Sequence, residues 1–303
     1  MSTQRLLRKL QQDLDETGLR GSFVVRDLDT GEELSLEPDL EFAAASLVKV
    51  PLALATLDRI HRGELNGATP MTVQPGLLKA SGPAGLSKFQ YPAVVALDDL
   101  VYLSTSMSDN TAADALFTLT PPARVTAILN SFAITGLSVR HPMTPLTETP
   151  AERLAPEEAH LAHSLAISAQ TTGRGHPVHQ LDVTRANTGS ARAFVDLLQA
   201  VWTPNPVATE VAARLRNLMA ETVMRQRLAP DFSSDTARWA SKTGTLLNLR
   251  HEIGVVEHSD GDRYAVAALT ESRVAAASQP QADACMGRVA RSLRDELRGN
   301  RRR

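Results

Sequence analysis

The sequence predicts an α+β fold, in which an antiparallel sheet comes from the two ends of the chain and a mostly helical part comes from the middle. Short extended runs follow a first helix, segments of helical period fill the centre, and further extended runs precede a last helix. We expect residues 1–45 and 229–303 to form the sheet-containing part and residues 46–228 to form the helical part. A functional site is expected at their junction.

The chain is expected to begin with an amphipathic helix that leads into a hairpin. Leu6, Leu10 and Leu14 recur at four-residue steps on one helix face, and Gly18 is a suitable helix stop. Residues 21–37 then form two extended runs around an Asp-Thr-Gly turn. These runs supply the first strands of the predicted sheet.

The middle of the chain is predicted to be mostly helical. Its alanine- and leucine-rich segments are separated by Pro and Gly turns, and the clearest of them span residues 51–65, 97–107, 111–119 and 190–202. Residues 141–184 lack a clear period, so we expect a long, partly irregular connection there.

Extended runs return near the C-terminus. They span residues 238–242, 251–258 and 262–272, and the last two flank a Ser-Asp-Gly turn that is typical of hairpins. A closing helix is indicated by apolar residues at helical spacing between Met286 and Leu297. We therefore expect both chain ends to build one antiparallel sheet flanked by terminal helices.

Composition excludes several classes of function. A 303-residue chain that is 43% hydrophobic can bury a core unaided, and its formal charge of −2 gives no field to attract nucleic acid or an anionic membrane. The single cysteine, Cys285, excludes an internal disulfide. The start lacks the apolar run of a signal peptide, so we expect a cytoplasmic protein, or a periplasmic or secreted one if a leader was trimmed. Composition does not indicate an oligomeric state.

Ser46 and Lys49 form the first candidate catalytic pair. Residues three apart on a helix share a face, so the amine can reach the hydroxyl, and a neutral lysine can accept the serine proton. Only five lysines accompany 27 arginines, which favours a chemical role for the lysines that are kept. Taken alone, the pair is also compatible with a helix-capping serine beside a surface lysine.

Two further tripeptides follow in order. Ser108-Asp109-Asn110 lies between two helical segments, and Lys242-Thr243-Gly244 ends an extended run. A capped helix turn and a strand end are the plain structural explanations of each. The set S-x-x-K, S-D-N and K-T-G, however, is typical of class A β-lactamases and penicillin-binding proteins.

The chain resembles the class A β-lactamase-related serine hydrolases over nearly its whole length. The resemblance extends past the three motifs to residues 108–114, 224–232 and 250–254. It implies a β-lactamase/transpeptidase-like fold. It also implies that Ser46 is the acylated nucleophile and Lys49 its proton partner, that Ser108 relays a proton to the leaving nitrogen, and that Lys242 adds positive field.

The same resemblance implies five substrate-binding residues. Asn110 would hold a side-chain amide of the substrate, and Thr243 and Arg250 would bind its carboxylate. Gly244 would allow the substrate to approach the backbone closely, and the N–H of Thr245 would form an oxyanion hole with that of Ser46. The expected partner is a small β-lactam or a peptide-like substrate.

The sequence departs from efficient β-lactamases in one respect, since it lacks the E-x-x-L-N motif whose glutamate activates the deacylating water. Four glutamates lie in the corresponding region without that context: Glu148, Glu152, Glu157 and Glu158. Hydrolysis of the β-lactam amide through a Ser46 acyl-enzyme is the first hypothesis. The alternatives are a D,D-peptidase-like enzyme, an esterase or amidase with slow deacylation, and a penicillin-binding module without turnover. Asp182 or Arg185 is a candidate to pin the end of this loop.

No metal or cofactor is predicted. The pairs His160/His163 and His176/His179 have no clear third ligand and no H-E-x-x-H context. The sequence also has no glycine-rich phosphate loop of the usual nucleotide-binding patterns.

Overall fold

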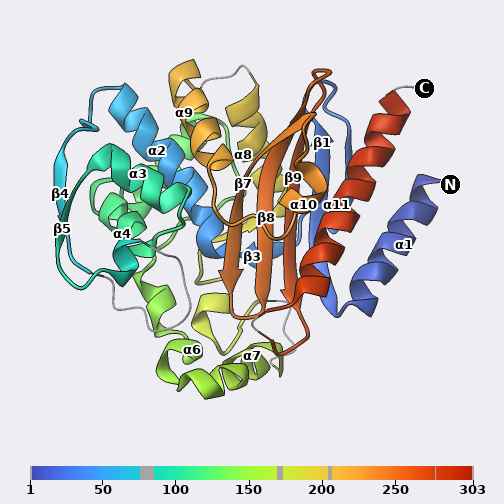
Figure 1. Cartoon of the computed structure of the whole chain (residues 1–303), viewed down its shortest axis with the longest axis horizontal. Helices are drawn as coiled ribbons and strands as arrows, with labels where there is room; N and C mark the ends of the chain where they lie inside the picture. Colours follow the sequence, from blue (N-terminus) through green and yellow to red (C-terminus); the bar gives the residue numbers. More distant parts are fainter. Residues whose placement is uncertain (1, 76–84, 169–172, 204–206, 277, 302–303) are drawn as a thin grey trace.

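A five-stranded antiparallel sheet forms the centre of the computed structural model, which describes residues 2–75, 85–168, 173–203, 207–276 and 278–301 (Figure 1). The strand order is β2-β1-β9-β8-β7. The strands are β1 (Leu19–Asp27), β2 (Glu33–Leu36), β7 (Ala237–Leu246), β8 (Leu249–His258) and β9 (Arg263–Ser272). Every pair in the sheet is antiparallel, β9 is the middle strand, and β1 pairs with it so that Leu19 lies opposite Ser272. The prediction that both chain ends build one sheet is confirmed.

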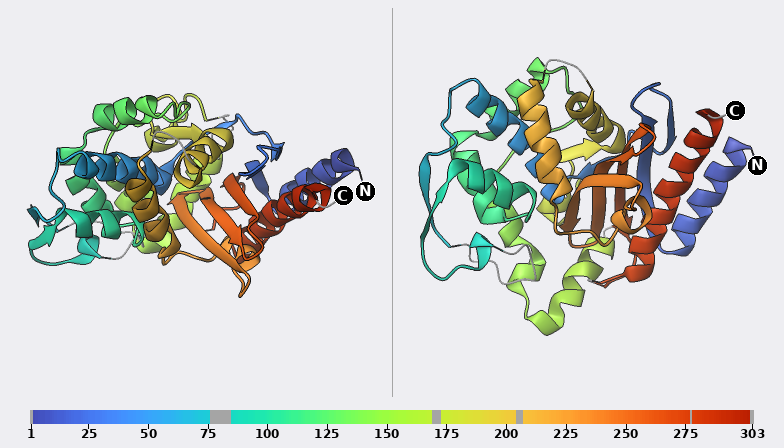
Figure 2. Two further views of the ribbon diagram at one scale, coloured as in Figure 1. Left: turned by 90° about the horizontal axis from the view of Figure 1, so that it is seen from above. Right: turned by 45° about the horizontal axis from the view of Figure 1, so that its top comes forward.

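Two terminal helices cover one face of the sheet. The helices α1 (Thr3–Glu16) and α11 (Pro280–Arg301) lie side by side in all three ribbon views (Figures 1 and 2). Leu6, Leu10 and Leu14 of α1 are buried in the same cluster as Leu293 and Leu297 of α11. This predicted apolar face anchors the chain ends to each other.

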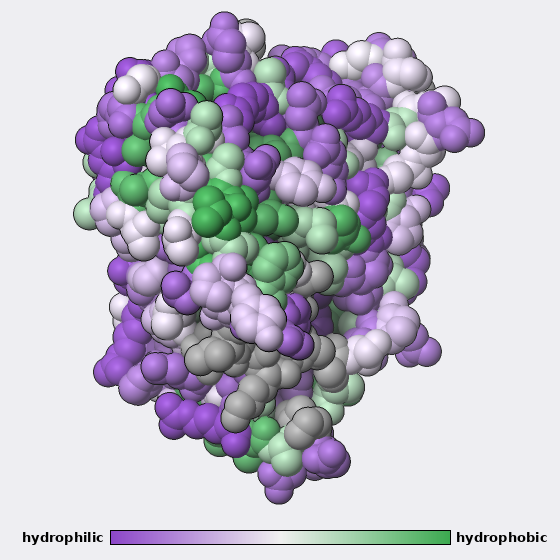
Figure 3. Space-filling model, turned by 60° about the vertical axis from the view of Figure 1, so that its left-hand side comes forward, coloured by the Kyte–Doolittle hydropathy of each residue, from purple (hydrophilic) through white to green (hydrophobic). Residues whose placement is uncertain are grey.

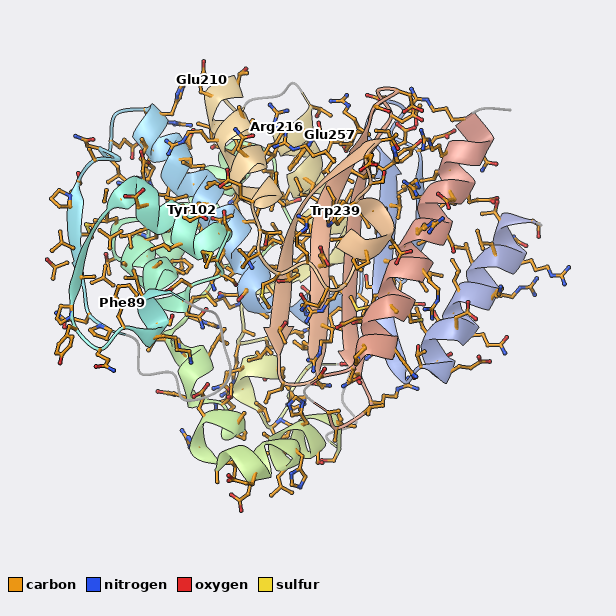
Figure 4. The ribbon with its side chains drawn as sticks, viewed as in Figure 1. Phe89, Tyr102, Glu210, Arg216, Trp239 and Glu257 are labelled. Carbon is orange, nitrogen blue, oxygen red and sulfur yellow. The ribbon has the colours of Figure 1, made fainter. Side chains whose placement is uncertain are left out.

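The edge strand β7 is packed from the same side. The indole of Trp239 points from β7 toward α10 (Ala229–Phe232) (Figure 4) and stacks on the Phe232 ring with centroids 4.8 Å apart. Its N–H donates a 2.9 Å hydrogen bond to the buried carboxylate of Glu252.

The other face of the sheet is covered by the helical part. Its main helices are α2 (Lys49–His61), α3 (Leu97–Thr105), α4 (Asn110–Leu119), α5 (Pro122–Ser131), α8 (Ala191–Trp202) and α9 (Thr209–Ala220). The helix α2 is buried from Lys49 to Asp58, which explains why its sequence is apolar on all sides. Across the described residues, we find no helix with the length and apolar character needed to cross a membrane.

The structure also contains two short strand pairs that the sequence analysis did not predict. The strand β4 (Pro70–Val73) pairs with β5 (Ala93–Ala96), and β3 (Glu41–Ala43) pairs with β6 (Thr188–Ser190). The β4–β5 ribbon forms the left edge of the molecule in Figure 1. When that edge faces the reader, hydrophobic surface lies across the middle of the face (Figure 3).

The connection over residues 141–184 holds more helix than expected. Its elements are η3 (Thr144–Glu148), α6 (Pro150–Arg153), η4 (Pro156–Glu158), α7 (Ala159–Ser168) and η5 (His179–Leu181). The helices α6 and α7 lie below the sheet in Figure 1.

Candidate active site

The candidate nucleophile lies at the point where β3 turns into the buried helix α2. Ser46 is in the short helix η1 (Ala45–Val48), is half-buried, and follows Ala45, whose φ of 48° is in the left-handed region. Such a backbone angle is strained for alanine and is a recurrent feature of functional turns. Lys49, one helical turn on, is fully buried.

The Lys49 amine is the centre of the site. Its Nζ lies 3.3 Å from the Ser46 hydroxyl and 3.3 Å from that of Ser108. It also donates to the Ser108 carbonyl at 2.5 Å and to the Asn110 side-chain oxygen at 2.6 Å. Burial lowers the pKa of Lys49 well below its usual value, and the nearby Lys242 lowers it further. The amine is therefore suited to accept a proton from Ser46.

Ser108 is held between two lysines by a capped helix start. The Asp109 side chain accepts a hydrogen bond from the Ala112 N–H at 2.9 Å, so it caps α4, and it also binds the hydroxyl and N–H of Ser87. Ser108 has a φ of 59° and receives a 2.8 Å hydrogen bond from Lys242. The plain capping role and the catalytic arrangement are thus both present.

The edge strand β7 brings Lys242 and the segment after it against η1. Lys242 is fully buried, which lowers its pKa to about 7, with a further lowering by Arg227 and an opposing effect from Glu252. A Cβ on Gly244 would lie 3.1 Å from the Ala44 carbonyl, so glycine permits this close approach. The structure therefore brings Ser46, Lys49, Ser108, Asn110, Lys242 and Gly244 together.

Arg250, on the neighbouring strand β8, binds backbone carbonyl groups. The Arg250 guanidinium donates to the backbone carbonyls of Leu247 at 2.6 Å, Leu249 at 2.8 Å and Ala276 at 3.1 Å. Its role toward a substrate carboxylate stays a prediction.

Arg227 was not singled out in the sequence, although the matching segment 224–232 contains it. Its Nη2 donates to the exposed Thr245 hydroxyl at 2.7 Å. Thr243, the other threonine expected to bind substrate, is buried.

The four glutamates of the long loop do not bond to the nucleophile. Within the described chain, the hydrogen bond of the Ser46 hydroxyl is to Lys49, and no carboxylate contacts it at that range. Glu148, Glu157 and Glu158 are exposed to solvent.

The loop is closed by a residue that the sequence analysis missed. The Asn187 side chain accepts from the N–H groups of Arg140 at 2.7 Å and His141 at 3.1 Å, and donates to the His141 carbonyl at 3.0 Å. Asp182 instead accepts from Gly175 and Thr184, so it pins a turn inside the loop. Arg185 is exposed and lies 3.8 Å from Asp182. Asp182, one of the two candidates to pin the end of the loop, therefore stabilises a turn within the loop.

Among the paired histidines, His176 binds backbone groups through both ring nitrogens. His176 lies 3.0 Å from the Ala166 carbonyl through Nε2 and accepts from the Val178 N–H through Nδ1. Over the residues that the structure covers, we find no cluster of three or more histidine, cysteine or acidic side chains suited to a metal ion.

This geometry defines a class of protein. A half-buried serine beside a buried lysine with a lowered pKa, a second serine between two lysines, and an edge strand against the first serine form an arrangement that is typical of serine acylation sites, on a class A β-lactamase-like fold. The chain belongs to the Beta-lactamase enzyme family, whose model matches residues 5–297.

Relatives of known sequence or structure agree with this family. The beta-lactamase regulatory protein BlaB of Streptomyces cacaoi is 60% identical over 309 residues, which cover 98% of this chain and 99% of BlaB. The structure of PBP-A has a TM-score of 0.76 at 19% identity and covers 98% of this chain and 97% of its own. A β-lactamase from Chitinophaga pinensis has a TM-score of 0.77 at 20% identity, covering 97% and 99%. The two structures show a shared fold.

Proposed function

We propose that the protein reacts covalently, through Ser46, with a β-lactam or a peptide-like amide. The observation that carries the proposal is the buried Lys49 amine, 3.3 Å from the Ser46 hydroxyl and with a strongly lowered pKa. The Ser46 oxygen forms a bond to the substrate carbonyl carbon while its proton passes to Lys49. The carbon–nitrogen bond then breaks, Ser108 delivers a proton to the leaving nitrogen, and Lys49, 3.3 Å from the Ser108 hydroxyl, returns the proton from Ser46 to Ser108.

Neighbouring groups support this chemistry. The N–H groups of Ser46 and Thr245 would stabilise the oxyanion, at about 3 kcal/mol for each donor on the mutational scale for such holes. Lys242 and Thr243 would attract a substrate carboxylate, and Asn110 would hold an amide of the substrate.

We further propose that the acyl-enzyme is hydrolysed slowly. The described contacts of Ser46 include no carboxylate that could activate a water, in line with the missing E-x-x-L-N motif. A relative named as a regulatory protein supports a role in which a long-lived adduct acts as a signal. Fast β-lactam hydrolysis is the second candidate, and the presence of all three motifs S-x-x-K, S-D-N and K-T-G favours it.

The proposal is tested with a chromogenic cephalosporin and a penicillin, followed by intact mass measurement of the same samples. We expect one adduct on the wild type with little colour, and none on Ser46→Ala. The variant Ser131→Ala, at an exposed helix position, should label like the wild type. Rapid colour with an unmodified mass would support fast hydrolysis, and labelling of Ser46→Ala would contradict the nucleophile assignment.

A further inference from the structure

Arg227 is a buried cation behind the strand that forms the edge of the site. Only 2% of the residue is exposed. Its Nε binds Asp283 of α11 at 3.1 Å, and its Nη1 donates to the carbonyls of Gly244 at 3.2 Å and His251 at 2.9 Å. With the bond to Thr245, one guanidinium therefore spans α11, β8 and the end of the third motif on β7.

The bond to the Gly244 carbonyl acts on a particular peptide group. The Gly244 C=O and the Thr245 N–H belong to one planar trans peptide, so they point in opposite directions. Because the carbonyl faces Arg227 and the neighbouring strand β8, the N–H points to the free edge of β7. The turn that carries Ser46 packs on that side, where Gly244 approaches the Ala44 carbonyl.

We propose that Arg227 is a positioning residue, which orients and polarises the Gly244–Thr245 peptide so that the Thr245 N–H becomes a stronger donor to the substrate oxyanion. This inference rests on the proposed acylation by Ser46. A cation that binds a carbonyl oxygen draws electron density from the amide, and chained hydrogen bonds strengthen one another in a low-dielectric interior. Asp283 holds the guanidinium in place.

The test uses Arg227→Gln, Arg227→Lys and the double variant Arg227→Gln/Asp283→Asn. The double variant removes both charges of the ion pair, so it guards against destabilisation by a partly buried Asp283 that has lost its partner. Phenylboronic acid is the first probe, because it adds to a nucleophilic serine to give a tetrahedral oxyanion and carries no carboxylate. We expect all three variants to bind it about tenfold to a hundredfold more weakly than the wild type, with Arg227→Lys the least affected.

Kinetics with penicillin supply the second readout. We expect the maximal acylation rate constant to fall by a similar factor, while the concentration for half-maximal rate changes little, because the oxyanion forms only after binding. The matched control is Arg263→Lys, whose arginine also binds a backbone carbonyl and an aspartate, Trp202 and Asp29, away from the site. It should behave as the wild type in both assays.

Nuclear magnetic resonance separates this inference from the proposed function. Loss of the bond to the Gly244 carbonyl should move the Thr245 amide nitrogen upfield in Arg227→Gln and in the double variant, whether or not the protein reacts with β-lactams. An unchanged Thr245 resonance, or unchanged boronate binding by folded Arg227→Gln, would overturn the inference. A loss confined to ligands with a carboxylate would also overturn it, because Arg227 would then be an anchor for that group. A wild type that binds neither penicillin nor boronate would refute the proposed function alone, and the Thr245 resonance would still decide the role of Arg227.

Discussion

Both lysines of the site are buried, but their proposed roles differ: Lys49 acts as a base when it is neutral, and Lys242 attracts a carboxylate when it is charged. Burial lowers the pKa of both Lys49 and Lys242, because a cation loses hydration in the interior. For Lys49, burial is the main cause of the lowered pKa and the charge of Lys242 adds to it, which favours the neutral amine that a base requires. Lys242 has a pKa of about 7, so its charge, which would attract a substrate carboxylate, is partly lost at neutral pH.

The pKa of Lys242 predicts how the rate of acylation depends on pH. With a pKa of about 7, Lys242 loses its positive charge as the pH rises through that value. We expect the second-order rate constant for labelling by penicillin to fall as pH rises from 6 to 9. Lys242→Arg, which keeps its charge over this range, should flatten the profile. A rate constant that rises over the same interval in the wild type would argue against a cationic role for Lys242.

His251 makes the stability of the protein sensitive to acid. It is fully buried between the Ala43 carbonyl and the Thr270 N–H, and burial lowers its pKa to about 3. The unfolded chain binds this proton below about pH 6.5, so the free energy of unfolding should fall as pH drops from 6.5 to 3, by up to about 5 kcal/mol. Urea titrations of wild type and His251→Gln at several pH values measure it. Equal pH slopes in the two proteins would contradict this assignment.

Residue identity at the site was predictable where the signal is local in sequence. Ser46 and Lys49 are one helical turn apart, and Ser108 and Lys242 stand in short motifs. Arg227 was missed because its role depends on three elements that only the folded chain brings together.

At the scale of elements, Asn187 links the two ends of the loop over residues 141–186 to the segment that carries the nucleophile. We call this junction the neck of the loop. The Asn187 carbonyl accepts a 2.7 Å hydrogen bond from the Ala44 N–H, two residues before Ser46. Its side chain binds the other end of the loop at Arg140 and His141. The strand pair β3–β6 at this neck was missed, because each strand has three residues and the partners lie far apart in sequence. Such short pairings depend on tertiary contacts more than on local pattern.

Removing the Asn187 side chain should therefore loosen the loop. Asn187→Ala leaves the Arg140 and His141 backbone groups without their partner, at a cost of about 1–3 kcal/mol. We expect faster hydrogen–deuterium exchange over residues 141–186, and slower acylation because Ala44 is held less firmly. Asn187→Asp keeps the acceptor and should show a smaller effect. Exchange in that loop that matches the wild type would show that Asn187 does not close it.

At the scale of the whole molecule, the central sheet joins sequences that lie far apart. The strand β1 is paired with β9 over nine residues. In turn, β9 is paired with β8, and β8 is paired with β7, the strand that carries Lys242. The general alternation of helix and extended runs predicted this arrangement, since neither chain end can bury its apolar face alone. The sheet is thus shared by the terminal helices on one face and the helical part on the other. We expect the two parts of the chain to unfold together.

Leu14→Ala tests that coupling from the side remote from the site. Leu14 of α1 is fully buried in the core cluster that α1 shares with α11 and the sheet. Its truncation should therefore lower the free energy of unfolding by about 2–5 kcal/mol. Because the sheet is common to both parts, loss of penicillin labelling in urea should coincide with the loss of circular dichroism signal, at a midpoint below that of the wild type. Leu161→Ala, at a position on α7 that is 48% exposed, is the control and should shift neither transition. Labelling that survives in Leu14→Ala after the main structural transition would instead mean that the helical part keeps the site without the chain ends. In that case the junction, and the Lys242 that it supplies, would be dispensable for acylation.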